Sequence, residues 1–478
     1  GPVNIPTSTT ATGVWQQEEQ YEARVTDTWP ERPLFTTKSL RFNEGSSDYL
    51  NRTPASAGNR KTWTYSTWIK RSNIANNTIT SCYSAGNDSD IISIIVRSTG
   101  EFRISAWTIN WRVANRLFRD VSAWYHIVVA IDTTQATAND RIKVYVNGVQ
   151  ETSFSTINNP SLNQDIGYNQ ASTTRVGAPS NALNNFFDGY MSETVFIDGT
   201  ALDPTSFGVA NSDGVWTPIP YTGTFGNNGF NLQFENSAAL GTDSSPNGNT
   251  FTVNNLTSID QTTDYPVVNY ATFNPLTNRS GTTATHSEGN LKVVWSGGTN
   301  TPSMGTIGVQ SGKWYYESKM FWGSNSYIGI TYDSTPTNTD VKGYLLRQTG
   351  EKYDAFTGSG SSYTSALSSG DTVMIAFDAD NGTLWFGVNG TWSNSATQTE
   401  IEDGTTTNSA FSSIDMSYIW LPMGKGGVSS NARIEANFGN PIYTISSGNT
   451  DGNGYGNFEY AVPSGYYALN TANLAEFG

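Results

Sequence analysis

The stretch YHIVVAID at residues 125–132, followed by IKVYVNG at residues 142–148, indicates how this chain folds. Side chains alternate along both segments, and a period of two places every second side chain on the same face of a strand. Asn147 and Gly148 then supply the left-handed backbone conformations that a tight hairpin turn requires. The stretch therefore predicts two successive strands, the second of which ends in a tight hairpin turn.

The same pattern extends outward along the chain. From residue 34 onward, short alternating segments are separated by Asn-Gly, Asp-Gly and Ser-rich turns, which is typical of an all-β sandwich. The pair VAID (129–132) and KVYVNG (143–148) has a counterpart in IAFD (375–378) and LWFGVNG (384–390). This repetition predicts two related sandwiches in one chain.

These patterns divide the chain into four segments. We expect an N-terminal arm or short helix at residues 1–33, a first sandwich at 34–210, a connector at 211–285 and a second sandwich at 286–478. Within the connector, short strands are expected at 229–234 and 251–256.

The composition excludes several classes of protein. The 478 residues carry a formal charge of −15, and only 14% of them are charged, against ~25% in an average soluble protein. Aromatic residues make up 13%, which is enough apolar area to exclude a disordered chain. Nucleic acid is excluded as a partner because binding it requires clustered cations, and no apolar run approaches the ~18 residues that span a bilayer.

The cysteine content and the N-terminal residues restrict the class of protein further. The single cysteine, Cys82, cannot form an internal disulfide. The N-terminus has no signal-peptide pattern, and Gly1-Pro2 has the form of a remnant of a cleaved tag, so we expect the natural chain to begin upstream.

Motifs in both expected sandwiches resemble those of known domain families. The first sandwich resembles laminin-G-like domains with a concanavalin-type jelly-roll fold, through LRFNEGSSDYL (40–50), WTYSTWIK (63–70), WYHIVVAID (124–132) and FDGYMSETV (187–195). The other sandwich is similar to a SPRY domain, through SGKWYYE (311–317), YIGI (327–330), GDTVMIAFD (370–378) and GTLWFGVNG (382–390). The resemblance implies an all-β chain of two concanavalin-like, jelly-roll β-sandwiches, laminin-G-like and then SPRY-like.

The combination of the two domains is similar to large structural proteins of bacteriophages, especially marine ones. The connector contributes to this resemblance through NGFNLQF (228–234), TVNNL (252–256) and YATFNPL (270–276). It implies a tail fibre or other extracellular virion appendage, commonly a homotrimer, that contacts a host surface glycan or receptor and other virion proteins. Two alternatives stay open: a structural virion decoration protein that uses its sandwiches for protein contacts, and a secreted cellular adhesin.

Exposed aromatic rings would bind a glycan, because the C–H face of a sugar stacks on a ring while nearby amides form hydrogen bonds with its hydroxyls. In the first sandwich, Trp107 and Trp111 are expected on one face of a strand. In the second, strand ends and loops are expected to present Trp322, Tyr327, Tyr344 and Trp392.

The alternative for every such ring is a place in the core, the usual role of aromatic residues on sandwich strands. We expect it of Trp68, Trp124 and Trp314. The charge of −15 favours neutral glycans over strongly anionic polysaccharides unless a cation intervenes.

A calcium ion near the rim of the first sandwich is a further implication of the resemblance. Calcium takes oxygen ligands from carboxylates, amides and backbone carbonyls, and the matching positions are Asn43, Glu44, Asp48 and Asp188. Ser192 stands where the family frequently has an Asp, which weakens the match. The alternative is that these residues only form turns.

We expect no enzymatic activity. Glycosidases need two carboxylates that face each other across a cleft, and the acids Glu193 and Asp198 fall on opposite faces of a regular strand. A Ser-His-Asp arrangement would depend on His126 or His286. We expect His126 to form a hydrogen bond at the sheet and His286 to be solvated in a loop.

Overall fold

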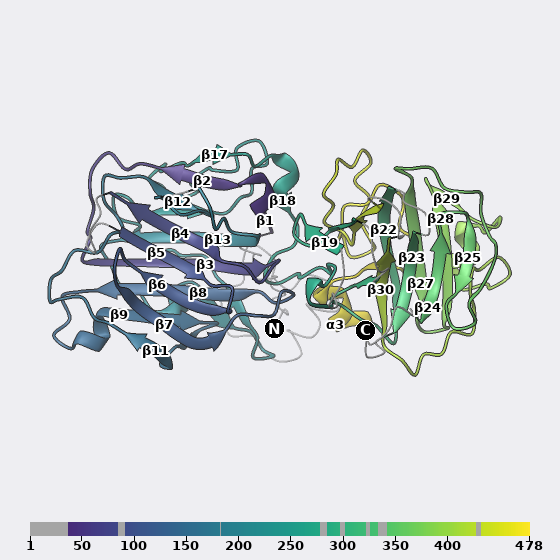
Figure 1. Ribbon diagram of the computed structural model, residues 1–478, viewed down its shortest axis with the longest axis horizontal. Helices are drawn as coiled ribbons and strands as arrows, with labels where there is room; N and C mark the ends of the chain where they lie inside the picture. The colour runs from purple at the N-terminus through teal and green to yellow at the C-terminus, as the bar shows by residue number, and fades with distance from the viewer. Residues whose placement is uncertain are drawn as a thin grey trace, which may run out of the picture.

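The computed structural model describes residues 37–84, 91–181, 183–277, 284–296, 302–321, 326–332, 342–426 and 432–478. In Figure 1 these residues form two β-sandwiches that lie side by side, the first in purple to teal and the second in green to yellow. The predicted all-β fold of two sandwiches is confirmed. The arm expected at residues 1–33 lies outside the described residues.

Helices are short in the part of the chain that the structure describes, and none has the length and apolar character needed to cross a bilayer. They are α2 (Gln398–Glu402), α3 (Thr471–Phe477) and the 3₁₀ turns η1 (Glu44–Ser46), η2 (Ala138–Arg141), η3 (Pro204–Ser206), η4 (Ser258–Asp260) and η5 (Pro275–Thr277).

The first sandwich contains two sheets, here called the first and second sheets. The first sheet is formed by β1 (Ser39–Phe42), β3 (Thr62–Arg71), β8 (Tyr125–Asp132), β9 (Ile142–Val146), β10 (Val149–Gln150), β13 (Gly189–Asp198), β16 (Phe230–Leu232) and β18 (Gln261–Thr262). Its spatial order is β10-β9-β8-β3-β13-β1-β18, and β16 also pairs with β13.

The second sheet has the spatial order β11-β7-β6-β5-β4-β12-β2-β17. These strands are β2 (Tyr49–Arg52), β4 (Asn77–Tyr83), β5 (Ile91–Val96), β6 (Glu101–Ser105), β7 (Asn110–Leu117), β11 (Phe154–Ile157), β12 (Thr174–Val176) and β17 (Thr252–Asn254). A separate ribbon pairs β14 (Gly208–Ala210) with β15 (Trp216–Pro218).

The alternating stretch at 125–132 becomes β8, and both of its faces are buried. Ile127, Val129 and Ile131 lie in the core between the two sheets. Val128 points the other way and is buried because Phe207 and its neighbours cover the outside of the first sheet.

The predicted hairpin turn is confirmed by its backbone. Asn147 and Gly148 join β9 to β10 with φ angles of 48° and 81°. In the second sandwich, Asn389 and Gly390 join β28 (Thr383–Val388) to β29 (Thr391–Trp392) with φ angles of 50° and 83°. The sequence repeat therefore corresponds to the same local structure in both sandwiches.

The segment expected as a connector is mostly part of the first sandwich. Its strands β16 and β17 form close to the predicted ranges, but they pair with β13 and β2. The strand β18 pairs with β1 at the edge of the first sheet. Short strands of this kind complete sheet edges instead of building a unit of their own, so the first sandwich extends to about residue 262.

The second sandwich also contains two sheets, here called the third and fourth sheets. The third is formed by β19 (Ala284–Ser287), β20 (Lys292–Trp295), β22 (Lys313–Phe321), β27 (Thr372–Asp378), β28, β29, β31 (Ala432–Asn437) and β32 (Tyr467–Ala468). The fourth is formed by β21 (Pro302–Met304), β23 (Tyr327–Tyr332), β24 (Gly343–Arg347), β25 (Glu351–Asp354), β26 (Ser359–Ser362) and β30 (Trp420–Lys425).

The spatial orders are β19-β20-β31-β22-β27-β28-β29 for the third sheet and β21-β30-β23-β24-β25-β26 for the fourth. Trp314, as predicted, lies in the core between them. The outer face of the third sheet is covered by the C-terminal segment, where Phe458 and Tyr466 pack on Tyr315 and Trp385.

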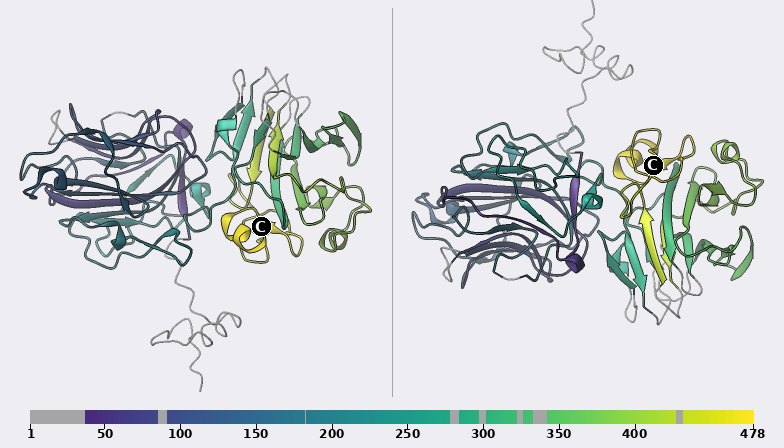
Figure 2. Two further views of the ribbon diagram at one scale, coloured as in Figure 1. Left: turned by 90° about the horizontal axis from the view of Figure 1, so that it is seen from below. Right: turned by 90° about the horizontal axis from the view of Figure 1, so that it is seen from above.

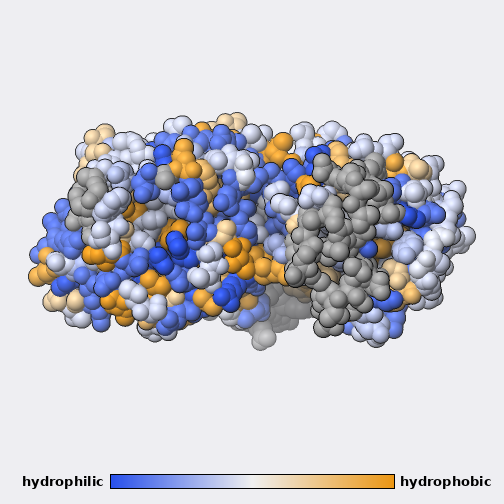
Figure 3. Space-filling model, viewed as in Figure 1, coloured by the Kyte–Doolittle hydropathy of each residue, from blue (hydrophilic) through white to orange (hydrophobic). Residues whose placement is uncertain are grey.

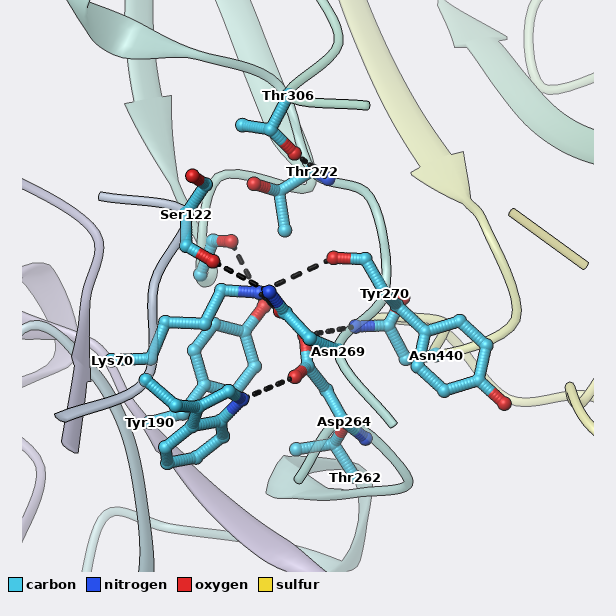
Figure 4. Close-up of polar contacts among 12 residues, drawn as sticks. Lys70, Ser122, Tyr190, Thr262, Asp264, Asn269, Tyr270, Thr272, Thr306 and Asn440 are labelled. Carbon is cyan, nitrogen blue, oxygen red and sulfur yellow. Dashed lines mark hydrogen bonds and ion pairs between the residues drawn. The ribbon is translucent and has the colours of Figure 1, made fainter. Parts of the chain in front are cut away.

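A buried ion pair lies at the junction of the two sandwiches (Figure 4). Lys70 Nζ is 2.8 Å from Asp264 Oδ2, and both side chains are at most 1% exposed. Lys70 also donates to Asn269 Oδ1 at 2.7 Å, and Trp124 Nε1 donates to Asp264 Oδ1 at 3.0 Å. From the second sandwich, Asn440 Nδ2 donates to Asp264 at 3.5 Å.

The residues after Asp264 run directly into the second sandwich. Asn269 Nδ2 donates to the carbonyl of Ser122 in the first sandwich at 2.6 Å, while the Asn269 carbonyl accepts from Thr471 N at 3.0 Å. In the two views of Figure 2, the C-terminus lies beside this junction. The two sandwiches are therefore joined through buried polar contacts and not through a bare linker.

Candidate ligand-binding site

The outer face of the second sheet carries a groove of about 370 Å³. It follows β4 and β5 and lies between the loop after β6 and the segment that precedes β13. Neutral polar groups dominate the described lining. They include the hydroxyls of Ser81, Ser93, Ser105 and Ser180 and the amides of Asn181, Asn184 and Asn185.

Strand alternation explains this lining. Along β5, Ile92 and Ile94 point into the core, which leaves Ser93 and Ile95 on the outer face. Ser93 lies opposite Ser105 of β6, so two hydroxyls face outward side by side. A regular half-buried strand thus gives the groove a mixed floor of hydroxyl and aliphatic groups.

Trp107 forms one side of the groove. It lies in the turn between β6 and β7, which Ala106 N closes by donating to the Ile109 carbonyl at 2.8 Å. Because the turn takes Trp107 out of the strand alternation, its ring does not enter the core and is 52% exposed. It is the most exposed tryptophan among the described residues.

The opposite side is fixed by hydrogen bonds to β4. Ser81 Oγ donates to the Ala178 carbonyl at 2.9 Å, and Ser180 Oγ donates to the Ser81 carbonyl at 2.8 Å. Thr78 N donates to the Asn185 carbonyl at 3.1 Å. These bonds hold the asparagine-rich segment in place, so the described sides of the groove are pre-formed.

The chemistry of the groove fits binding better than catalysis. Among its described lining residues, Arg97 alone carries a charge. Cys82 lies at the floor, and burial raises the pKa of its thiol, which keeps the sulfur neutral. An aromatic ring beside hydroxyls and amides can stack on a sugar ring and bond its hydroxyl groups.

The surface of the first sandwich is also largely polar. In the view of Figure 3, hydrophilic residues in blue cover most of its described surface, with hydrophobic residues in small groups. Such a surface makes specific contacts mainly through hydrogen bonds and single exposed rings.

Of the ligand-binding residues predicted from sequence, only Trp107 lines this groove. Trp111 was predicted to share its face, but it is 2% exposed and packs in the core. The two do not lie on one regular strand, because the turn between β6 and β7 separates them. The prediction for Trp111 is therefore wrong.

The predicted residues of the second sandwich do not form one site. Trp392 is buried beside Tyr315 under the C-terminal segment, so its predicted exposure is wrong. Tyr327 packs with Tyr353 on the outside of the fourth sheet, whereas Tyr344 packs against the core of the sandwich. Trp322 lies outside the described residues.

Trp68 and Trp124 are buried as predicted, at 3% and 9% exposure. They do not lie in the main core, however. Together with Tyr190 and Trp216 they form a small cluster of their own.

Sequence reasoning missed Arg97, Ser81 and the asparagines at 184 and 185. The available signal was the run GAPSNALNN at 177–185, in which small and amide side chains interrupt the strand pattern. Its position beside β4 follows from long-range pairing that the local sequence does not reveal.

The four predicted calcium ligands lie near one another but are arranged as a turn. Asn43 Oδ1 accepts from Gly45 N at 3.0 Å, and Asn43 N donates to Asp48 Oδ2 at 2.9 Å. The amide of Asn73 donates to Glu44 Oε2 at 3.3 Å and to Asp188 Oδ2 at 2.9 Å. Burial and nearby carboxylates raise the pKa of both Asp48 and Asp188 to about 7.

These residues fit a cation only in part. Oδ1 of Asp48 and Oδ1 of Asp188 are buried and have no hydrogen-bond partner among the described residues. Nevertheless, no three His, Cys, Asp or Glu side chains in the described ranges converge as a metal site requires. Calcium binding stays a prediction, which calorimetric titration with calcium tests.

The carboxylates and histidines considered for catalysis are engaged elsewhere. Glu193 is 4% exposed at a bulge in β13. His126 is fully buried between Ser66 and Trp216. The absence of enzymatic activity stays a prediction.

Comparison with known families agrees with this architecture. The family model of the concanavalin A-like lectin/glucanases superfamily (Laminin_G_3) matches residues 44–205, and that of the SPRY domain matches residues 313–406. The chain therefore contains a concanavalin A-like domain followed by a SPRY domain. No curated protein matches the chain in sequence.

Parts of the chain are also similar to solved structures. The SPRY domain of human HERC1 is 16% identical, with 34% of this chain and 96% of that chain covered and a TM-score of 0.27. The heptameric SAP-like pentraxin from Limulus polyphemus is 18% identical, with 36% and 80% covered and a TM-score of 0.28.

Proposed function

We propose that this chain is a non-enzymatic binding protein whose first sandwich holds a short glycan in the groove beside Trp107. The observation that carries the proposal is the exposed ring of Trp107 on the edge of a pre-formed groove lined by hydroxyls and amides. A sugar would place its C–H face on the ring and its hydroxyl groups on the serines and asparagines.

We assign this activity to a virion appendage of a bacteriophage, such as a tail fibre. The support is the sequence resemblance of the two-domain combination, together with a chain that is poor in cations, with 26 Lys and Arg among 478 residues. Binding through a single aromatic platform would be weak at each site. Several copies in one appendage would raise the overall affinity through avidity.

A glycan array with the full chain and Trp107→Ala tests the proposal. We expect the variant to bind several-fold to about tenfold more weakly, since stacking on one aromatic ring is worth about 0.5–1.5 kcal/mol beyond the area that it buries. Tyr418→Ala is the matched control, because Tyr418 is 45% exposed in the second sandwich and lies outside the groove. Equal binding by the wild type and Trp107→Ala, or no glycan binding at all, contradicts the proposal.

A second candidate function is protein contact through the SPRY domain, as a virion decoration protein would require. It is favoured by an aromatic cluster in which Phe356 and Tyr418, 37% and 45% exposed, both stack on Tyr332. Labelled protein bound to host cells separates the two functions. Cell binding that periodate oxidation of surface glycans abolishes supports the first function, whereas a decoration protein, whose partners are other virion proteins, should not bind the cells.

A further inference from the structure

The groove has two chemically different ends. Because Ser93 pairs with Ser105, Trp107 lies beside the start of β5, whereas Arg97 follows its last residue. Six residues of strand separate these positions, which corresponds to roughly 20 Å. A chain of a few sugars that stacks on Trp107 at one end can therefore reach Arg97 at the other.

Arg97 is held by a tight turn. Its backbone N donates to the Glu101 carbonyl at 2.9 Å, and its carbonyl accepts from Gly100 N at 2.8 Å. Gly100 has a φ of 92°, a conformation that favours glycine, and this closes the turn at the end of β5. The base of the Arg97 side chain is therefore fixed beside the groove that it lines.

The ion pairs between described residues leave Arg97 without a carboxylate partner. Glu101, the nearest acid along the described chain, pairs instead with Arg103. Arg97 is half-buried, and a guanidinium in that setting offers a planar fork of donors that matches a carboxylate.

We propose that the groove selects a glycan that carries a single carboxylate, of the uronic-acid or sialic-acid kind, with the carboxylate on Arg97 and a neutral sugar on Trp107. This inference rests on the proposed glycan binding and adds the class of sugar.

The overall charge is compatible with this selection. Mobile ions screen the field of the −15 charge beyond about 8–10 Å at ordinary ionic strength, whereas Arg97 acts at contact distance. A densely charged polysaccharide would still be repelled by the molecule as a whole. The preferred ligand therefore carries its acid at one position within a mostly neutral chain.

The test uses the full chain and pairs of oligosaccharides that differ only in one group, a carboxylate in one member and its reduced, neutral hydroxymethyl form in the other. Titration calorimetry of the wild type should show at least about tenfold tighter binding of the acidic member, as expected for a hydrogen bond to a charged group. Arg97→Gln should remove this preference. Arg97→Lys should keep part of it, since charge remains but the fork is lost.

Arg116→Gln is the matched control, because Arg116 is an exposed cation on β7 of the same sheet that does not line the groove. It should keep the full preference. Equal affinity of the wild type for both members, or a preference that survives in Arg97→Gln, overturns the inference while Trp107-dependent binding of the neutral member still supports glycan binding. If neither member of any pair binds, the proposed function and the inference fail together.

Discussion

At the scale of single residues, His126 shows how neighbours fix a protonation state. The indole N–H of Trp216 can only donate, and it lies 2.9 Å from Nδ1 of His126. Nδ1 must therefore accept, and the proton is on Nε2, which donates to Ser66 Oγ at 2.8 Å. Burial lowers the pKa of this histidine to about 3, so it is neutral at physiological pH.

The buried histidine predicts a pH dependence of stability. The folded pKa lies below the ~6.5 of an unfolded chain, so the stabilisation is complete above about pH 6.5 and is lost as the pH falls toward 3. We expect the free energy of unfolding of His126→Gln to depend less steeply on pH than that of the wild type. The difference in slope between pH 6 and 4 should approach about 1.4 kcal/mol per pH unit.

Denaturant unfolding of both proteins at several pH values measures this difference. Comparison of the two cancels the titration of Asp48 and Asp188, whose raised pKa acts in the opposite sense. His286→Gln provides a parallel case with the same sign over a narrower window, since burial lowers the pKa of His286 to about 4. Identical slopes for wild type and His126→Gln would contradict the prediction.

Local sequence predicted single residues well where the strand itself decides their surroundings. The hydrogen bond of His126 at the sheet is confirmed. His286 was predicted to be solvated in a loop, but it lies on β19 with Nε2 2.7 Å from Ser303 Oγ. Ser303 belongs to β21 in the other sheet, and no local pattern reveals that contact.

At the scale of elements, the hairpin turns were the feature that the sequence predicted best. Both Asn-Gly pairs adopt the left-handed conformations that join consecutive strands, because the requirement is local to two residues. The sheet to which a short strand belongs was harder to predict. The short strands β16 and β17 were placed correctly along the chain, but their partners β13 and β2 lie far away in sequence.

Besides its apolar packing, the C-terminal segment is bound to the third sheet by one buried carboxylate. Glu317 of β22 accepts from the backbone N of Glu459 at 3.0 Å and of Tyr460 at 2.8 Å. It also accepts from Tyr315 Oη at 2.9 Å and from Asn437 Nδ2 at 3.3 Å. These bonds hold the C-terminal segment against the third sheet.

We expect Glu317→Ala to lower the free energy of unfolding by about 3 kcal/mol, since it leaves several buried donors without an acceptor. Hydrogen exchange should show the largest loss of protection at Glu459 and Tyr460.

Glu351→Ala is the matched control for this prediction. Glu351 pairs with Arg347 at the surface of β25, and exposed pairs of this kind contribute little. Uniform exchange across the second sandwich in Glu317→Ala, with no local effect at the C-terminal segment, would count against this role of Glu317.

At the scale of the whole molecule, the contacts at the junction of the two sandwiches could not be predicted from the sequence. Lys70 and Asp264 are 194 residues apart, and no local pattern in the sequence links them. Only the packing of the two sandwiches buries them together. The same limit applies to the groove, whose two sides come from segments that are distant in sequence.

We expect Asp264→Asn to destabilise the protein by about 3–5 kcal/mol, because it leaves the buried charge of Lys70 without a counter-charge. The junction should also loosen, which small-angle X-ray scattering would detect as an increase in the radius of gyration.

The double variant Lys70→Met with Asp264→Asn should be less destabilised than Asp264→Asn alone, since no unpaired charge remains. Lys143→Met serves as the control, because its pair with Asp140 is exposed and should contribute at most about 1 kcal/mol. An Asp264→Asn variant with wild-type stability and scattering would show that the pair does not hold the sandwiches together.

The buried junction also determines how the molecule transmits force. Suppose that one sandwich grips a ligand while the other is anchored. With no slack linker between them, tension passes directly through Lys70, Asp264 and Asn269. Hydrogen bonds lose their attraction within a few tenths of a nanometre, and the ion pair weakens once water enters the opened junction and screens it. Under load the protein should therefore act as a stiff rod that hardly lengthens, and then yield abruptly in one step when the junction opens.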